Sequence, residues 1–139
     1  MTIYIHLRVV GALLMLLGLS HAFFDRYFGW RRELARVSLF TREVFFVHTF
    51  FIGLGVTMAG AGSFLYAGAL LQPSVLSRAI LAGMAMFWFC RLLTQWFVYD
   101  AALWRGDRFR TWMHGVFSVL WIYVTATYGG ALARVSFGR

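Results

Sequence analysis

Four long apolar runs, separated by short segments rich in arginine, dominate this chain of 139 residues. The runs cover about residues 5–24, 44–66, 78–99 and 111–132. A helix of about 20 apolar residues is long enough to cross the hydrocarbon core of a bilayer, which is about 30 Å thick. A helix also satisfies its own backbone hydrogen bonds, as a spanning segment in lipid must. The sequence therefore predicts an all-α integral membrane protein, with a single transmembrane domain over residues 1–139 that forms a four-helix bundle.

The composition agrees with a membrane protein. Apolar residues make up 61% of the chain and charged residues only 13%, whereas soluble domains carry about 25% charged residues. The net charge is +8, and all thirteen basic residues are arginine. A basic balance also occurs in nucleic-acid-binding proteins, but here the arginines flank the apolar spans, as topology rules predict. We therefore expect a lipid bilayer, and no nucleic acid, as a partner.

Two features of the chain exclude other interpretations. Cys90 is the only cysteine, so an internal disulfide and a Cys-x-x-Cys redox pair are both excluded. The first residues lack the positive segment and the small-residue cleavage site of a secretory signal peptide. We therefore expect the first span to be retained as a membrane anchor.

A short amphipathic segment lies between the first two spans. Over Gly29–Val37, Trp30 and Leu34 share one helical face, whereas Arg32 and Arg36 lie on the other side. A helix of this kind lies in the headgroup layer with its apolar face toward the acyl chains. The sequence predicts a short interfacial helix between spans one and two.

The arginines are divided unequally between the two faces of the membrane. Those in the segments Phe23–His48 and Asp100–Thr111 are Arg26, Arg31, Arg32, Arg36, Arg42, Arg105, Arg108 and Arg110. The opposite face has Arg8, Arg78, Arg134 and Arg139. Because arginine concentrates in cytoplasmic loops, we expect a bacterial inner-membrane protein with both arginine-rich loops in the cytoplasm and both termini in the periplasm.

Helical spacing predicts which face of each span packs against a neighbour. Small residues allow close helix approach, and they recur in span one at Gly11 and Gly18 and in span two at Gly55, Ala59 and Ser63, with Gly53 and Gly60 nearby. In span three the predicted stripe is Gly83, Phe87, Arg91, Gln95 and Tyr99. In span four it is His114, Ser118, Trp121, Thr125 and Tyr128. The alternating spacing of four and three in span four is typical of a helix–helix seam.

Three histidines occur within about two turns of the same membrane face in this topology. They are His21, His48 and His114, each on a different span. Neutral imidazole is a ligand of zinc, copper and iron, and two histidines can also ligate a haem. Asp25 and Glu43 could complete a metal site or orient the rings. The candidate cofactors are therefore haem or a zinc, iron or copper ion.

Arg91 is the charged residue placed deepest in a predicted span, about 12 Å from its end at 1.5 Å per residue. A charge inside a span is expensive and marks a functional candidate. A binding site for an anionic or quinone-like molecule would use Arg91, with Gln95 and Tyr99 as hydrogen-bond donors. In a purely structural role, Arg91 would instead pair with Asp25, Glu43 or Asp100, or reach the interface.

Three functions remain open on the sequence alone. The first is a non-catalytic accessory subunit or binding module, which contacts other membrane subunits or a second copy of itself. The second is a metal- or haem-binding protein that uses the histidines, with a redox role as one option. The third is a lipid- or quinone-binding enzyme or carrier centred on Arg91. Whether the chain is an enzyme is left open.

Overall fold

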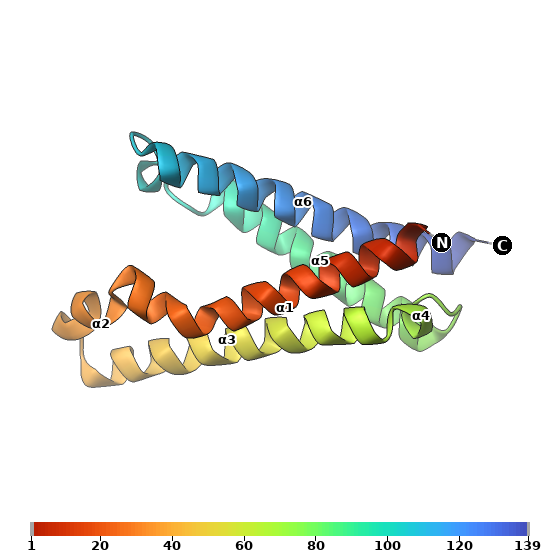
Figure 1. The fold of residues 1–139 in the computed structure, drawn as a ribbon, viewed down its shortest axis with the longest axis horizontal. Helices are drawn as coiled ribbons and strands as arrows, with labels where there is room; N and C mark the ends of the chain where they lie inside the picture. The colour runs from red at the N-terminus through yellow and green to blue at the C-terminus, as the bar shows by residue number, and fades with distance from the viewer. Residues whose placement is uncertain (1, 139) are drawn as a thin grey trace. The chain divides into compact units, whose positions relative to one another are not determined.

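The computed structural model describes residues 2–138 and confirms the predicted all-α class. Four helices are long and apolar enough to cross a membrane, and they make the chain a multi-pass membrane protein. These helices are α1 (Thr2–Phe28), α3 (Leu39–Leu65), α5 (Val75–Phe97) and α6 (Arg108–Phe137), drawn in Figure 1. Most of them extend beyond the predicted spans, because backbone hydrogen bonding continues past the last apolar residue until a cap or a turn ends it.

Short helical pieces connect the long helices. The predicted interfacial helix is α2 (Trp30–Glu33) followed by the 3₁₀ turn η1 (Leu34–Arg36), while α4 (Ala67–Leu70) and η2 (Ala101–Leu103) occupy the other loops. Side-chain caps fix where three of the long helices begin. The oxygens of Ser38, Ser74 and Asp107 each accept a hydrogen bond from a backbone N–H three residues later. Such caps satisfy donors that the first turn leaves unpaired.

The chain divides into two compact units, which are described separately. Unit 1 comprises Met1–Leu7 and Gly68–Arg139, so it contains α5, α6 and the first turns of α1. Unit 2 comprises Arg8–Ala67, so it contains the rest of α1 together with α3. The long helix α1 therefore contributes to both units.

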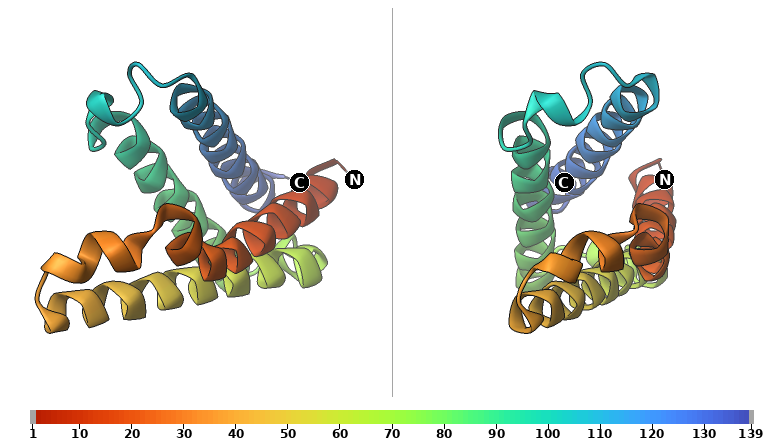
Figure 2. Two further views of the ribbon diagram at one scale, coloured as in Figure 1. Left: turned by 60° about the vertical axis from the view of Figure 1, so that its left-hand side comes forward. Right: turned by 90° about the vertical axis from the view of Figure 1, so that its left-hand side faces the viewer.

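Glycines bring α1 and α3 together in unit 2, and Figures 1 and 2 show these helices side by side. A Cβ added to Gly11 would lie 2.7 Å from the carbonyl oxygen of Gly60, and one added to Gly60 would lie 2.7 Å from that of Gly11. Gly18 and Gly53 form a second reciprocal pair, with distances of 2.7 and 3.0 Å to the carbonyl oxygen of the other. The two backbones thus approach to a distance at which no side chain fits between them.

The structure confirms that Gly53, Gly60 and Ser63 of α3 are buried, as predicted, and corrects the prediction for Gly55. Gly55 has no heavy atom within 4 Å of its added Cβ, so it does not take part in the contact with α1. The contact instead uses Gly53 and Gly60, which are seven residues apart. Seven residues make almost two full turns of a helix and keep side chains on one face, whereas each step of four rotates the position by about 40°.

The pairing of α5 with α6 in unit 1 confirms the seam predicted for span four. Trp121 and Tyr128 of α6 are buried, and the Trp121 ring stacks on Trp88 of α5 with centroids 5.2 Å apart. The stripe predicted for span three is correct only in part. Gly83 and Phe87 are exposed, and the buried residues of α5 are Ser77, Leu81, Trp88, Leu92 and Gln95.

The glycine contact predicts opposite effects for two neighbouring substitutions. Gly60→Ala would place a methyl group 2.6 Å from the backbone nitrogen of Met15, so overpacking should lower the free energy of unfolding by about 1–3 kcal/mol. Gly62→Ala meets no atom within 4 Å and should stabilise the helix slightly, by about 0.5–1 kcal/mol. Unfolding in mixed micelles, followed by circular dichroism, measures both. Equal stability of the two variants would contradict a close contact at Gly60.

Candidate functional site

A chain of hydrogen bonds connects Arg91 and Gln95 of α5 to His114 of α6. Nη1 of Arg91 donates to Oε1 of Gln95 over 3.2 Å, and Nε2 of Gln95 lies 2.8 Å from Nδ1 of His114. Residues 91 and 95 meet because positions four apart lie on one helical face. Gln95 is buried, while Arg91 and His114 are half-buried. The polar chain therefore bridges the two helices inside their seam.

Aromatic rings surround the guanidinium of Arg91. Its Cζ atom lies 4.8 Å from the centroid of the Trp121 ring and 5.6 Å from that of Tyr99. A cation over an aromatic face gains about 0.5–2 kcal/mol, with the higher value in desolvated sites. Trp121 is held in turn by its stack on Trp88. These contacts partly compensate the positive charge without neutralising it.

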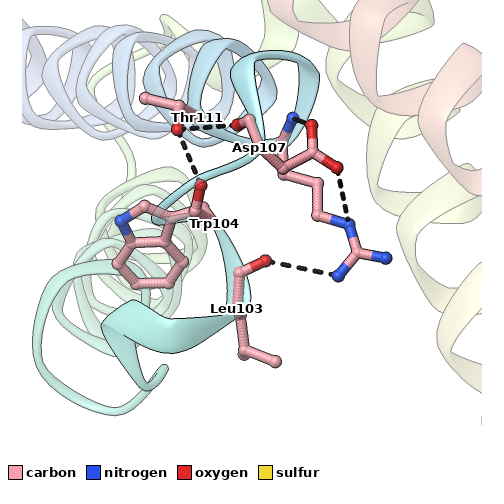
Figure 3. A network of polar contacts seen from close by, with 5 residues as sticks. Leu103, Trp104, Asp107 and Thr111 are labelled. Carbon is pink, nitrogen blue, oxygen red and sulfur yellow. Dashed lines mark hydrogen bonds and ion pairs between the residues drawn. The ribbon is translucent and has the colours of Figure 1, made fainter.

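The loop before α6 positions the last member of the site, Trp104. The Thr111 hydroxyl lies 2.8 Å from the carbonyl oxygen of Trp104 and 2.9 Å from that of Asp107, and Figure 3 shows this network. The Trp104 ring stacks on His114 with centroids 3.9 Å apart and an angle of 14° between the planes. Trp104 therefore covers one face of the imidazole while Gln95 holds its Nδ1 atom.

The direction of each hydrogen bond between Arg91, Gln95 and His114 follows from which atoms can donate and which can accept. A guanidinium N–H can only donate, so the Gln95 oxygen must face Arg91 and the amide nitrogen must face His114. That nitrogen also only donates, so Nδ1 of His114 accepts and the neutral ring carries its proton on Nε2. His114 thus has neither a free Nδ1 nor an unprotonated Nε2 available for a metal.

The other two histidines have the opposite arrangement. Nδ1 of His21 lies 2.8 Å from the carbonyl oxygen of Leu17, and Nδ1 of His48 lies 2.7 Å from that of Val44. A carbonyl oxygen only accepts, so in both rings Nδ1 carries the proton. His21 also packs against α3, since a Cβ on Gly53 would lie 2.8 Å from its own Cβ. Over residues 2–138, no group of three or more histidine, cysteine or acidic side chains is placed to hold a metal ion.

The carboxylates expected near the site have other partners. Asp25 forms an ion pair with Arg31 over 2.6 Å, and Glu43 lies 3.8 Å from Arg42. Asp100 accepts from the backbone N–H of Ala102 at the start of η2. Within unit 1, the expected pairing of Arg91 with Asp100 is therefore wrong, because Arg91 donates to Gln95 instead. Contacts between residues close in sequence cost little chain entropy.

Sequence reasoning missed two aromatic members of the site. Trp88 lies three residues before Arg91 and seven before Gln95, and this spacing could have placed it on their face. No sequence pattern connects Trp104 to His114. Its position depends on the fold of the loop, which cannot be obtained from periodicity. The predicted residues Arg91, Gln95 and Tyr99 do lie together, and His114 joins them.

Comparison with protein-family models, with curated proteins and with solved structures finds no match to this chain. The function must therefore be inferred from the site.

The Gln95–His114 hydrogen bond predicts a measurable coupling between the two side chains. In a double-mutant cycle of Gln95→Ala and His114→Ala, the interaction energy should be about 0.5–1.5 kcal/mol, the range of interhelical hydrogen bonds in membranes. Gln95→Ala with Thr127→Ala is the matched control, since Thr127 donates to the carbonyl oxygen of Tyr123 on its own helix. Unfolding free energies in micelles supply the values. An interaction energy of zero between Gln95 and His114 would exclude their hydrogen bond.

Proposed function

We propose that the protein is a membrane-embedded binding module that holds a lipid or a quinone-like molecule at Arg91. Gln95, His114, Trp121 and Tyr99 complete the site. The ligand would contribute oxygen atoms that accept hydrogen bonds from the guanidinium. This proposal joins the binding-module interpretation to the site that was predicted around Arg91.

One observation carries the proposal. Among the described residues of unit 1, neither Asp100 nor Asp107 forms an ion pair with Arg91, and the arginine's hydrogen bond to a side chain is made to the neutral amide of Gln95. The residue lies six positions before the end of α5, or about 9 Å along the helix axis. An arginine at such a depth is expensive and is kept where it has a partner or a substrate. A ligand oxygen would supply the missing acceptor.

The metal and haem alternatives receive less support from the contacts. His114 is held by Gln95 and Trp104, and its protonation does not suit a ligand role. Asp25 and Glu43 each have an arginine partner. His21 and His48 bond backbone carbonyls through Nδ1, which leaves Nε2 of each ring free. A metal or haem site at these residues stays a prediction from the sequence.

The proposal also includes the membrane location and the orientation of the protein. The arginine distribution supports an inner-membrane location with the two arginine-rich loops in the cytoplasm and both termini outside. Arg91, Gln95 and His114 would then lie in the cytoplasmic half of the bilayer. The protein could serve larger membrane complexes as an accessory subunit. A Cβ added to Gly55 or Gly62 of α3 would meet no atom within 4 Å, which leaves room for such a partner.

Substitution of Arg91 tests the proposed function. Native mass spectrometry of the purified protein, with added phosphatidylglycerol or decylubiquinone, measures ligand retention directly. Arg91→Ala should reduce retention of the bound probe by about 10- to 100-fold, the value of a charge-assisted hydrogen bond of about 1.5–3 kcal/mol.

Arg78→Ala is the matched control, because it removes an arginine from the first turn of the same helix. It should bind like the wild type. The proposed function fails if neither probe binds to the wild type, or if Arg91→Ala retains the probe as well as Arg78→Ala does.

A further inference from the structure

The polar chemistry of the α5–α6 seam points to a more specific ligand. We infer that the site selects an anionic phosphodiester headgroup over a neutral quinone, because it offers an excess of hydrogen-bond donors and no carboxylate. This inference depends on the proposed binding function at Arg91 and adds the chemical class of the ligand.

Two buried indole N–H groups contribute to this excess of donors. The indole nitrogens of Trp88 and Trp121 are buried and have no hydrogen-bond partner among the described residues. Both indole N–H groups can only donate. Thr125, one turn after Trp121, has a buried hydroxyl that is also unpartnered. A native structure rarely leaves buried polar groups unpaired, and the Trp121 ring that carries one of these donors also faces the guanidinium of Arg91.

Two side-chain acceptors beside Arg91 already have donors. Oε1 of Gln95 accepts from Arg91, and Nδ1 of His114 accepts from Gln95. The remaining guanidinium N–H groups and the Nε2–H of His114 are donors. The aromatic rings compensate the positive charge of Arg91 only in part. A ligand with several oxygens and a negative charge satisfies both needs, whereas a quinone carbonyl supplies an acceptor and no charge.

A lipid headgroup fits the place of the site better than a soluble phosphate does. Phe87, Trp96 and Phe97 have exposed fractions of 58%, 46% and 77%, and they surround this stretch of α5 with apolar surface. In a membrane these side chains face acyl chains. A lipid would therefore place its phosphate at Arg91 while its chains contact the same helix.

The experiment compares four probes and one nearly isosteric variant. Wild-type protein in nanodiscs or detergent is titrated with phosphatidylglycerol, diacylglycerol, decylubiquinone and inorganic phosphate, and binding is read by native mass spectrometry. Phosphatidylglycerol should bind at least about tenfold more tightly than each of the other three, as expected for a charge-assisted contact.

Gln95→Glu tests the selection of an anionic headgroup by changing the charge of the site itself. The new carboxylate would take the place of the amide, within 3.2 Å of Nη1 of Arg91, and would supply both the acceptor and the charge. Phosphatidylglycerol affinity should fall about tenfold or more. Gln72→Glu is the control, because it makes the same change at an exposed position in the turn before α5, and it should bind like the wild type.

Each outcome decides a different claim. If decylubiquinone binds at Arg91 as tightly as phosphatidylglycerol, the proposed function survives and the selection of an anion is wrong. Inorganic phosphate that binds as tightly as the lipid would overturn the headgroup assignment. Unchanged binding of phosphatidylglycerol by Gln95→Glu would also overturn the inference. If no probe shows binding that depends on Arg91, the proposed function itself fails.

Discussion

Inside a bilayer the burial of apolar side chains does not drive helices together, because lipid tails are as apolar as the side chains themselves. Close packing and hydrogen bonds must hold the helices instead. The two units use these two means separately. In unit 2 the backbones of α1 and α3 meet at Gly11–Gly60 and Gly18–Gly53, where any side chain would keep them apart.

Unit 1 uses aromatic stacking and a polar bridge, and these contacts also create the site. The stack of Trp88 on Trp121 fixes the face of α5 that meets α6, and the same face carries Arg91 and Gln95. The amide nitrogen of Gln95 donates to His114, and its amide oxygen accepts from Arg91. The side chains that hold α5 against α6 therefore also surround the guanidinium of Arg91.

The sequence predicted the helices well because apolar runs of this length have few other folds available in lipid. It also predicted the α6 face, where spacings of four and three keep Trp121 and Tyr128 on one side. Steps of four alone were misleading: they selected Gly55 on α3 and Gly83 on α5, both of which have no neighbour within 4 Å of an added Cβ. Successive steps of four rotate around the helix, whereas steps of seven return almost to the same face.

The site was predictable only within one helix. Arg91, Gln95 and Tyr99 follow from the spacing in α5, whereas the partner of Gln95 depends on how α6 is aligned against it. The histidines had been grouped by membrane depth, and depth alone does not determine which side chains meet. His114 therefore belongs with Arg91 and Gln95, and Trp104 reaches it through a loop that periodicity does not describe.

Solid-state NMR gives the most direct test of the central claim that Arg91 holds a lipid phosphate. Protein labelled with ¹⁵N-arginine and reconstituted in phosphatidylglycerol is compared with its Arg91→Lys variant by ¹⁵N–³¹P dipolar recoupling. A coupled guanidinium signal that is present in the wild type and absent from the variant is the predicted result. Identical ¹⁵N–³¹P spectra for the two proteins would contradict a phosphate at Arg91.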